Sequence, residues 1–450
     1  MRHLHGSAIA VAVAAATAPL AGQGPAPASL GDALRQADRG AYANRIAAGQ
    51  RDARAAAATQ ALRGILPALR FQGGYVGTNE PLSAFGTRLQ QGAVTQADFD
   101  PARLNDPAVI GNFTTAAIVE APLLVPEALA GRRAASRASE AGAAEAGWTR
   151  AQTRMQVVRA WYGAILAREL VGALDSASRA AHAHVRDAES AVRHGVATRS
   201  DALLAAVKAG EADARLAQAR ADAENARAAL AVALGSPGER GISLPARLPD
   251  TAAVRAFAAR GLAAAERQDV RAAALGERAA EADLGRARAL LLPRLVSFAR
   301  YDFNAPGRPL GGQGSWTAGV MVSWSPFSGA SEIGERQAAR GRLASARAGA
   351  EAARAQAGLE HETAARAVET ALLRLSIAED AVRQGGEAHR IVTRKYEGGL
   401  ATVVELLDAA AVETQARVEL ARAVHDAVVA TAARLLASGG DPGAVAALEH

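Results

Sequence analysis

The sequence predicts a mainly α-helical fold with a small β part, built from one structural plan that occurs twice. Long stretches rich in Ala, Arg and Glu and free of proline are typical of helices. Short segments in which apolar and polar residues alternate are typical of strands. Sequence features also recur at a constant spacing of 204 residues. A repeat of this length is too long for a solenoid, so the chain is expected to be an internal duplication.

The duplication is clearest at a turn between two helical patterns, which begins at Gly195 in the first copy and at Gly399 in the second. The same spacing relates Gly235 to Gly439. The matching residues of the two turns are Gly195, Ala197, Thr198, Asp201 and Leu203, and Gly399, Ala401, Thr402, Glu405 and Leu407.

The first residues have the pattern of a secretory signal peptide, and we assign residues 1–22 to it. Arg2 precedes an apolar run from Ala8 to Ala18, and small residues follow. This run is too short to cross a bilayer as a helix, and no later stretch approaches about 20 apolar residues. Because the chain has no cysteine, disulfides, thiolate metal sites and a lipid-modified cysteine are excluded.

Composition gives no sign of a nucleic-acid partner. The formal net charge is +6 over 450 residues, and arginine supplies nearly all of the basic residues. Aromatic residues make up 4% of the chain and lie mostly outside the helical segments. A basic groove with stacking aromatic side chains is therefore not expected.

In the first repeat, Leu66-Pro67 ends a helix, because the residue before a proline favours an extended backbone. A polar loop of about residues 77–111 joins two alternating segments. The elements expected here are helices at 29–65 and 124–235, the latter turning at Gly195, strands at 67–76 and 112–122, and a connector at 236–250.

The second repeat follows the same plan, with Leu292-Pro293 in the place of Leu66-Pro67. An uninterrupted helical pattern such as 126–194 could reach roughly 100 Å, and a helix of that length needs lateral partners. The elements expected are helices at 251–291 and 328–437, strands at 294–303 and 315–326, and a C-terminal tail at 438–450.

The turn at Gly399 is expected to place two carboxylates on one helix face. Glycine supplies the left-handed backbone that ends the first helix. Thr402 can cap the next helix, and Glu405, three residues later, completes a capping box. Glu405 and Asp408 then share a face at i, i+3 spacing. The simplest interpretation is a solvated face, and a functional one requires several copies around an axis.

The strands of the second repeat have one apolar face. Trp316, Ala318, Val320, Val322 and Trp324 alternate with Ser, Thr, Gly and Met. The two tryptophans are roughly 20 Å apart along a tilted strand, close to the ~25 Å between the aromatic girdles of a transmembrane β-barrel. Tyr75 and Tyr301 are candidates for the same girdle. A soluble sandwich with one buried face is the alternative.

Four strands cannot close a barrel, and an open sheet in lipid would leave backbone groups without hydrogen-bond partners. Either the hairpins lie outside the membrane, or several chains combine their strands. Three chains would give twelve strands, which is within the range of outer-membrane barrels, whereas two would give eight and little lumen. An oligomer would also supply lateral partners for the long helices.

These features together resemble the TolC family of outer-membrane efflux proteins, over essentially the whole mature chain. The resemblance rests on the signal peptide, the tandem halves, the Leu-Pro pairs before strands, the Ser-Pro-Phe that follows Trp324, and the turn motif from Tyr396 to Ala409. It implies a homotrimer with a 12-stranded barrel in the outer-membrane lipid and a long α-helical barrel in the periplasm. The periplasmic tip would open when an adaptor protein and an inner-membrane pump dock, so that the duct exports small molecules or secreted protein.

The resemblance also implies roles for residues of the tip. Glu405 and Asp408 correspond to the pore constriction. Tyr396 and Asp201 correspond to a tether of the closed state. An arginine of the family that strengthens this tether is replaced by Ala401.

The sequence shows no catalytic constellation, cofactor motif or metal motif, so neither an enzyme nor a bound cofactor is expected. His182 and His184 are two residues apart on a helix and point to different faces, which does not suit a metal site. His389 has no partner close in sequence and is expected to be solvated. One alternative is a structural periplasmic coiled-coil protein with a small β-domain that lies outside the membrane. The other is a hydrolase, for which the sequence offers no catalytic residues.

Overall fold

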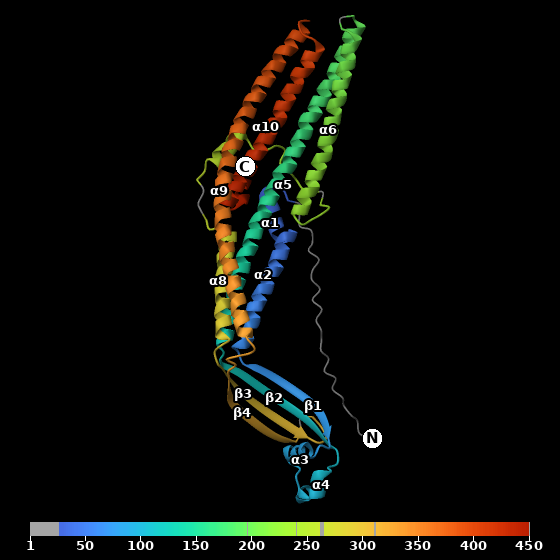
Figure 1. Ribbon diagram of the computed structural model, residues 1–450. Coiled ribbons are helices and arrows are strands. Elements are labelled where there is room, and N and C mark those ends of the chain that lie inside the picture. Colours follow the sequence, from blue (N-terminus) through green and yellow to red (C-terminus); the bar gives the residue numbers. More distant parts are fainter. Residues whose placement is uncertain (1–26, 196, 240, 262–264, 310–311, 450) are drawn as a thin grey trace, which may run out of the picture.

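The computed structural model describes residues 27–195, 197–239, 241–261, 265–309 and 312–449. A long column of helices carries a small sheet at one end and two helical hairpins at the other (Figure 1). The predicted fold class, mainly α with a small β part, is confirmed. The predicted signal peptide, residues 1–22, lies outside the described residues.

Two long helices, one per repeat, run the length of the column: α5, Pro126–Arg193, and α9, Ser331–Glu397. Near the sheet they are accompanied by α2, Tyr42–Gln60, and α8, Gln268–Ala289. Towards the far end they turn back into α6, Arg199–Ala233, and α10, Val403–Ala437. The middle of the column holds the short elements α1, Leu30–Gly40, α7, Thr251–Ala258, and the 3₁₀ helix η3, Pro442–Glu449.

The sheet is an antiparallel meander with the strand order β1-β2-β3-β4. The two hairpins, one from each repeat, join through β2 and β3, so residues far apart in sequence become neighbours. The strands are β1, Ala68–Thr78, β2, Ile110–Leu124, β3, Arg294–Ala305, and β4, Gln313–Ser323. No strand of the described chain pairs with the outer edge of β1 or of β4.

The register brings the apolar faces of the strands together on one side of the sheet. Phe71 lies opposite Ala117, Ala117 opposite Tyr301, and Tyr301 opposite Trp316. Residues directly opposite each other in an antiparallel pair point to the same face. The next row, in which Arg70, Ile118, Arg300 and Thr317 are opposite one another, therefore lies on the other face. We call these two surfaces the apolar face and the polar face of the sheet.

The predicted loop at 77–111 is not without structure. It contains α3, Pro81–Gln90, the 3₁₀ helix η2, Gln96–Phe99, and α4, Pro101–Asn105. Both α-helices begin with proline directly after an acidic residue: Glu80 accepts hydrogen bonds from the N–H groups of Leu82 and Ser83, and Asp100 caps α4 in the same way. Proline at the first helical position costs no hydrogen bond, which explains why a Pro-containing loop forms helices.

The single helices predicted at 29–65 and 251–291 are wrong, because each is interrupted. The first breaks at Ala41, between α1 and α2, and the second breaks between α7 and α8, which begins after Arg267. Ala41 and Arg267 have nearly the same extended backbone, with φ −58° and ψ 133°, and φ −63° and ψ 134°.

A glycine from the end of a distant helix lies against each break. Gly235, which follows α6, and Gly439, which follows α10, have φ values of +77° and +79°. A Cβ on Gly235 would lie 2.1 Å from the Gly40 carbonyl oxygen, and one on Gly439 would lie 2.3 Å from that of Ala265. The breaks are therefore set by contacts with residues about 170 to 200 positions away, and only glycine fits both contacts.

The largest hydrophobic core lies at this middle level, around the fully buried Trp161 and Tyr162 of α5. The residues predicted as a C-terminal tail fold back onto it as η3, with Val445 fully buried. The Glu449 carboxylate accepts hydrogen bonds from the indole Nε1 of Trp161 at 2.7 Å and from the backbone N–H of Leu30 at 2.8 Å.

We expect Glu449→Ala to lower the free energy of unfolding by at least about 2 kcal/mol, because two buried donors lose their acceptor and each such loss costs about 1–3 kcal/mol. Urea denaturation followed by circular dichroism measures the change. Glu419→Ala, at an exposed position of α10, is the control and should shift stability by no more than about 0.5 kcal/mol. Equal effects of the two variants would show that η3 does not hold the core.

Candidate functional site

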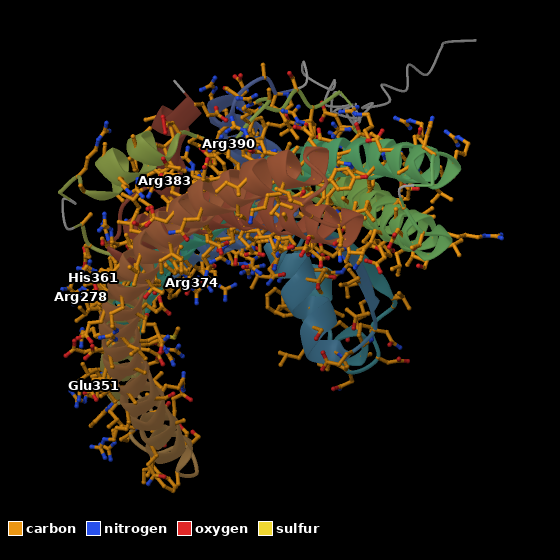
Figure 2. The ribbon with its side chains drawn as sticks, turned by 90° about the horizontal axis from the view of Figure 1, so that it is seen from above. Arg278, Glu351, His361, Arg374, Arg383 and Arg390 are labelled. Carbon is orange, nitrogen blue, oxygen red and sulfur yellow. The ribbon has the colours of Figure 1, made fainter. Side chains whose placement is uncertain are left out.

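The residues singled out from the sequence lie at the two ends of the molecule. The tip is the end at which α5 turns into α6 and α9 turns into α10, and the sheet is at the other end (Figure 1). Seen from above, the long helices follow an arc, with arginines such as Arg374, Arg383 and Arg390 along α9 (Figure 2). The chain thus has the form of a curved wall rather than a closed body.

Both tip turns have the same backbone. Gly195 and Gly399 have φ values of +73° and +71°. Thr198 and Thr402 are the N-caps of α6 and α10, and each forms a capping box with the acidic residue three positions later. In the second turn, the N–H of Thr402 donates to the Glu405 carboxylate at 2.8 Å, and the N–H of Glu405 donates to the Thr402 hydroxyl at 3.2 Å.

A small apolar cluster unites the two hairpins at the tip. Its buried members are Ala188 of α5, Ala205 of α6, and Val403 and Leu407 of α10. Leu406 and Leu407 are buried, whereas Glu405 and Asp408 are exposed on the other side of the same helical turn. The two carboxylates therefore point away from the packed side of α10, as a pore-lining pair or a solvated pair would.

The structure does not join Tyr396 to Asp201. Tyr396 packs partly buried against the tip cluster. The Asp201 carboxylate instead accepts hydrogen bonds from the N–H and the hydroxyl of Thr198, at 3.0 and 2.8 Å. Among the residues described here, no hydrogen bond links the phenol to this carboxylate. The tether remains a prediction for the assembled protein.

The structure contains a histidine–carboxylate pair below the tip that the sequence did not predict. His389 of α9 is not solvated as expected: it is 27% exposed and lies 2.5 Å from the Glu413 carboxylate of α10. It lines a cavity of about 550 Å³ together with His184 of α5. Burial lowers the pKa of His184, Asp187 raises it and His389 lowers it further. Nothing in the local sequence pattern pairs His389 with a residue 24 positions later.

His182 also has a partner on a neighbouring helix. Its ring lies 2.9 Å from the Asp213 carboxylate of α6, which also accepts a hydrogen bond from Ser178 at 2.6 Å. These hydrogen bonds, with that from Ser178 the strongest, lower the pKa of Asp213. Across the described ranges, no three His, Cys, Asp or Glu side chains are arranged to hold a metal ion.

Tyr75, Tyr301 and Trp316 stand exposed on the apolar face of the sheet, and Trp324 is exposed directly after β4. The exposed fractions are 61% for Tyr75, 43% for Tyr301, 74% for Trp316 and 62% for Trp324. Trp324 lies at the end of the sheet next to the helices, where its indole donates to the Leu291 carbonyl at 3.0 Å. The other three lie towards the loop end, where the tilted rings of Tyr75 and Phe113 and of Tyr301 and Phe303 pack together, with centroids 4.8 and 4.9 Å apart.

Phe113 and Phe303 were not among the candidates, although Phe303 follows Tyr301 at the spacing of one strand face. The apolar face therefore has an aromatic band at the loop end and one tryptophan at the helix end. The part of the chain that the structure describes contains no helix with the length and hydrophobicity needed to cross a membrane.

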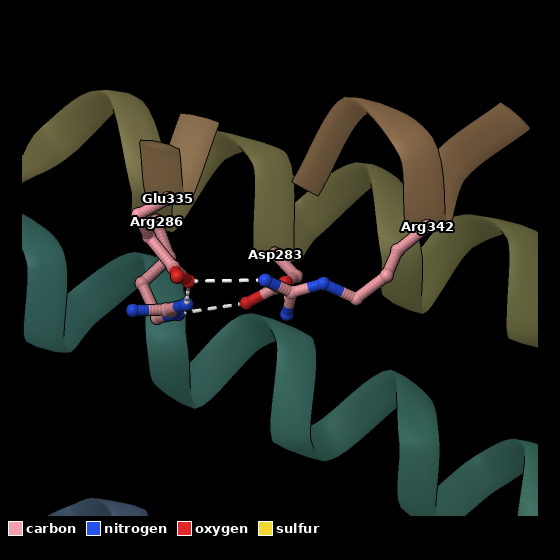
Figure 3. A network of polar contacts seen from close by, with 4 residues as sticks. All are labelled: Asp283, Arg286, Glu335 and Arg342. Carbon is pink, nitrogen blue, oxygen red and sulfur yellow. Dashed lines mark hydrogen bonds and ion pairs between the residues drawn. The ribbon is translucent and has the colours of Figure 1, made fainter. Parts of the chain in front are cut away.

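An ion-pair network ties α8 to α9 just above the sheet (Figure 3). Asp283 and Glu335 each bind both Arg286 and Arg342, at distances of 2.6 to 3.1 Å. Hydrogen bonds from Arg286 and then Arg342 lower the pKa of Glu335. The network therefore fixes α8 against α9 at the level where the strands begin.

Comparison with known proteins gives the fold of the described chain and a family match for part of its sequence. Residues 259–440 match the sequence model of the outer membrane efflux protein family. No curated protein sequence matches the chain.

Three solved structures illustrate the likeness of fold. The outer membrane protein VceC of Vibrio cholerae has a TM-score of 0.73 at 18% identity, covering 91% of this chain and 96% of that one. The CmeC outer membrane channel of Campylobacter jejuni has a TM-score of 0.74 at 16% identity, with 92% and 86% covered. The open MtrE outer membrane channel of Neisseria gonorrhoeae has a TM-score of 0.72 at 19% identity, with 92% and 89% covered.

The second repeat thus carries the family's sequence, and the described chain carries the fold of outer-membrane channels, with the strands at one end and the long helices at the other. The sequence match and the structural likeness agree in pointing to proteins of the outer membrane with a channel role in efflux. Residues 259–440 thus carry the sequence of the outer membrane efflux protein family, and the described chain has the mainly helical fold with a small four-stranded sheet that the resemblance to the TolC family implied.

Proposed function

We propose that the protein is the passive, trimeric outer-membrane duct of a tripartite export system, opened at its tip by an adaptor protein and an inner-membrane pump. The observation that carries this proposal is the four-stranded sheet with an exposed apolar face and two edges that no strand of the described residues pairs with. The exported substrates would be small molecules, such as drugs, toxic compounds or metal ions, or secreted protein. The exposed carboxylates of the tip are consistent with an aqueous path.

The sheet edges call for other copies of the chain. A strand edge in hydrocarbon would leave N–H and C=O groups unsatisfied, at several kcal/mol each. If β4 of one chain pairs with β1 of the next, three chains form a closed barrel of twelve strands. The apolar face would then meet lipid, and the polar face would line the lumen.

The duplication supports the same assembly in the helical part. Leu407 of α10 is buried in the tip cluster with Ala188 of α5, whereas its counterpart 204 residues earlier, Leu203 of α6, is 60% exposed. The counterpart of α5 is α9, which exposes Leu373 and Ile377 at 62% and 59%. If both repeats pack alike, α6 of one chain contacts α9 of the next. Each interface between the two repeats of one chain then has a matching interface between chains.

The tip is the element that would open. Three copies of Glu405 and Asp408 around one axis would form an acidic constriction. In the closed state, Tyr396 would donate a hydrogen bond to Asp201, whose carboxylate is now used by the Thr198 cap. Ala401 offers no additional charged contact. Docking of the adaptor would separate the two hairpins where only the small tip cluster joins them.

We expect Val320→Arg to reduce the amount of folded, membrane-inserted trimer far more than Thr317→Arg. Val320 lies on the apolar face, where arginine in mid-membrane costs about 2–4 kcal/mol, and Thr317 lies on the polar face. Heat-modifiable trimer bands in outer-membrane fractions measure assembly. If both variants lose trimer equally, the two faces are not divided between lipid and lumen.

We expect the double variant Glu405→Ala, Asp408→Ala to lose cation selectivity, because an acidic ring attracts cations and repels anions. Reversal potentials in planar bilayers under a salt gradient measure the selectivity, and multivalent cations should block the variant less. Glu419→Ala, an exposed carboxylate lower on α10, is the matched control. A double variant as cation-selective as the parent would assign the pair to the outer surface of the tip.

We expect Tyr396→Phe to raise single-channel conductance. The substitution keeps the packing against the tip cluster and removes only the phenol, and a hydrogen bond to a carboxylate stabilises by about 1.5–3 kcal/mol. Such a loss shifts a two-state tip at least about ten-fold towards the open state. Unchanged conductance of an intact trimer would mean that no tether forms.

A further inference from the structure

The loop between β1 and β2 crosses the sheet at the end away from the helices. It is 22 residues longer than the corresponding loop of the second repeat, counted between the paired prolines. The side-chain amide of Gln91, which follows α3, donates to the Gly111 carbonyl at 2.9 Å and to the Asn112 side chain at 3.0 Å. At Gly92, a Cβ would lie 3.5 Å from the side chain of Gln313 on β4. The loop therefore extends across the sheet, from the hairpin of β1 and β2 to β4 at the opposite edge.

The loop lies on the polar face. Asn304 and Gln313 are opposite each other and share this face with Thr114, in the register set by the Arg70 and Arg300 row. Asn112 and Asn304 are only 6% and 4% exposed. The Asn112 amide donates to the Asn304 side chain at 2.8 Å and to Thr114 at 2.9 Å. The loop reaches this buried pair through Gln91, which binds Asn112, and through Gly92, which lies beside Gln313, the residue opposite Asn304.

The loop is a folded unit with its own internal contacts. Phe85 of α3 packs edge-on against Phe99, with ring centroids 5.6 Å apart. Arg88 pairs with Asp98 at 3.4 Å, and Asp98 closes a capping box with Thr95. These contacts hold α3 as one body on the amide network beneath it.

Helix α3 turns its leucines away from the sheet. Ala84 is fully buried, and Gln91, seven residues later, lies on the same helix face and binds the sheet. Leu82 and Leu89 are on the opposite face, with exposed fractions of 79% and 62%. An amphipathic helix with its small and amide side chains on a polar surface and its leucines exposed needs a further apolar partner.

We propose that α3 forms an apolar outer gate in the external mouth of the duct, where Leu82 and Leu89 of three chains converge on the axis. The inference rests on the proposed function, since it requires the polar face to line the lumen. A ring of leucines excludes water and ions by dewetting and sets an upper size for what passes. Neutral hydrogen bonds from the Gln91 amide attach α3 to the sheet. Outward cargo can therefore displace the helix by breaking these hydrogen bonds.

The gate can be tested from outside the cell, independently of the tip. The site Thr317→Cys lies on the polar face, four residues from Gln313 along β4. Whole cells are treated with a bulky, membrane-impermeant maleimide, and the labelling rate is measured in the full chain. Two backgrounds remove the gate: Leu82→Ser with Leu89→Ser, and replacement of residues 80–108 by a short Gly-Ser linker. The variant with the two serines keeps the full loop. It therefore still tests the gate if the chain with the Gly-Ser linker fails to assemble.

We expect the parent loop to slow labelling of Thr317→Cys at least ten-fold relative to Asn105→Cys, an exposed site on α4. Either background should raise the Thr317→Cys rate at least ten-fold. A rate unchanged by both backgrounds would overturn the gate while leaving the duct intact. Ala318→Cys on the apolar face is the lipid-facing control. Asn105→Cys is available in the parent loop and in the serine background, which both keep residue 105. If Asn105→Cys reacts there while Thr317→Cys reacts no faster than Ala318→Cys in any background, the polar face does not line a lumen, and the proposed function itself fails.

Discussion

The outer edges of β1 and β4, which pair with no strand among the described residues, are the constraint on which the proposed assembly depends. A backbone N–H or C=O group has no partner in hydrocarbon, so a sheet can enter a membrane only as part of a closed barrel. The single chain supplies four strands whose register already separates an apolar from a polar face. In the proposed trimer, the rotation that joins the sheets would also place the curved helical walls of the three chains side by side.

The duplication makes this closure possible with one chain type. Each repeat supplies one β-hairpin and one long helix that turns back into a shorter one, so a contact between the two repeats of one chain has a matching contact available between chains. The matched glycines show how closely the two repeats agree. Gly235 lies against the helix break at Ala41, and Gly439 lies against the break near Arg267. At the second break Arg267 is almost fully buried, held by Asp269 and Glu360 at 2.7 Å and by the ring of Trp148. The first break has only an alanine there, so the two repeats have diverged in how they stabilise the same bend.

Features fixed by local chemistry could be predicted from the sequence. The capping boxes at Thr198 and Thr402 follow from short-range patterns, and the strand faces follow from alternation. The helices of the 77–111 loop could also have been predicted, since Glu80-Pro81 and Asp100-Pro101 are helix-start signals. What could not be predicted depends on residues far apart: the breaks at Ala41 and Arg267, the pairing of His389 with Glu413, and the sheet register that gathers Phe71, Tyr301 and Trp316. Local propensity favours a continuous helix at both breaks, and tertiary contact overrides it.

The two ends of the proposed duct differ in chemistry in a way that suits one-way traffic. At the tip, exposed carboxylates border a small apolar cluster, so the barrier there depends on charge and on how the hairpins pack. At the outer mouth, leucines on α3 stand over a network of neutral amides, so the barrier depends on wetting and on size. Salt screens the first barrier and hardly affects the second. Because the outer barrier does not depend on ionic strength, it would stay closed when the salt concentration outside the cell changes. The barrier at the tip would remain the one that a docking partner controls.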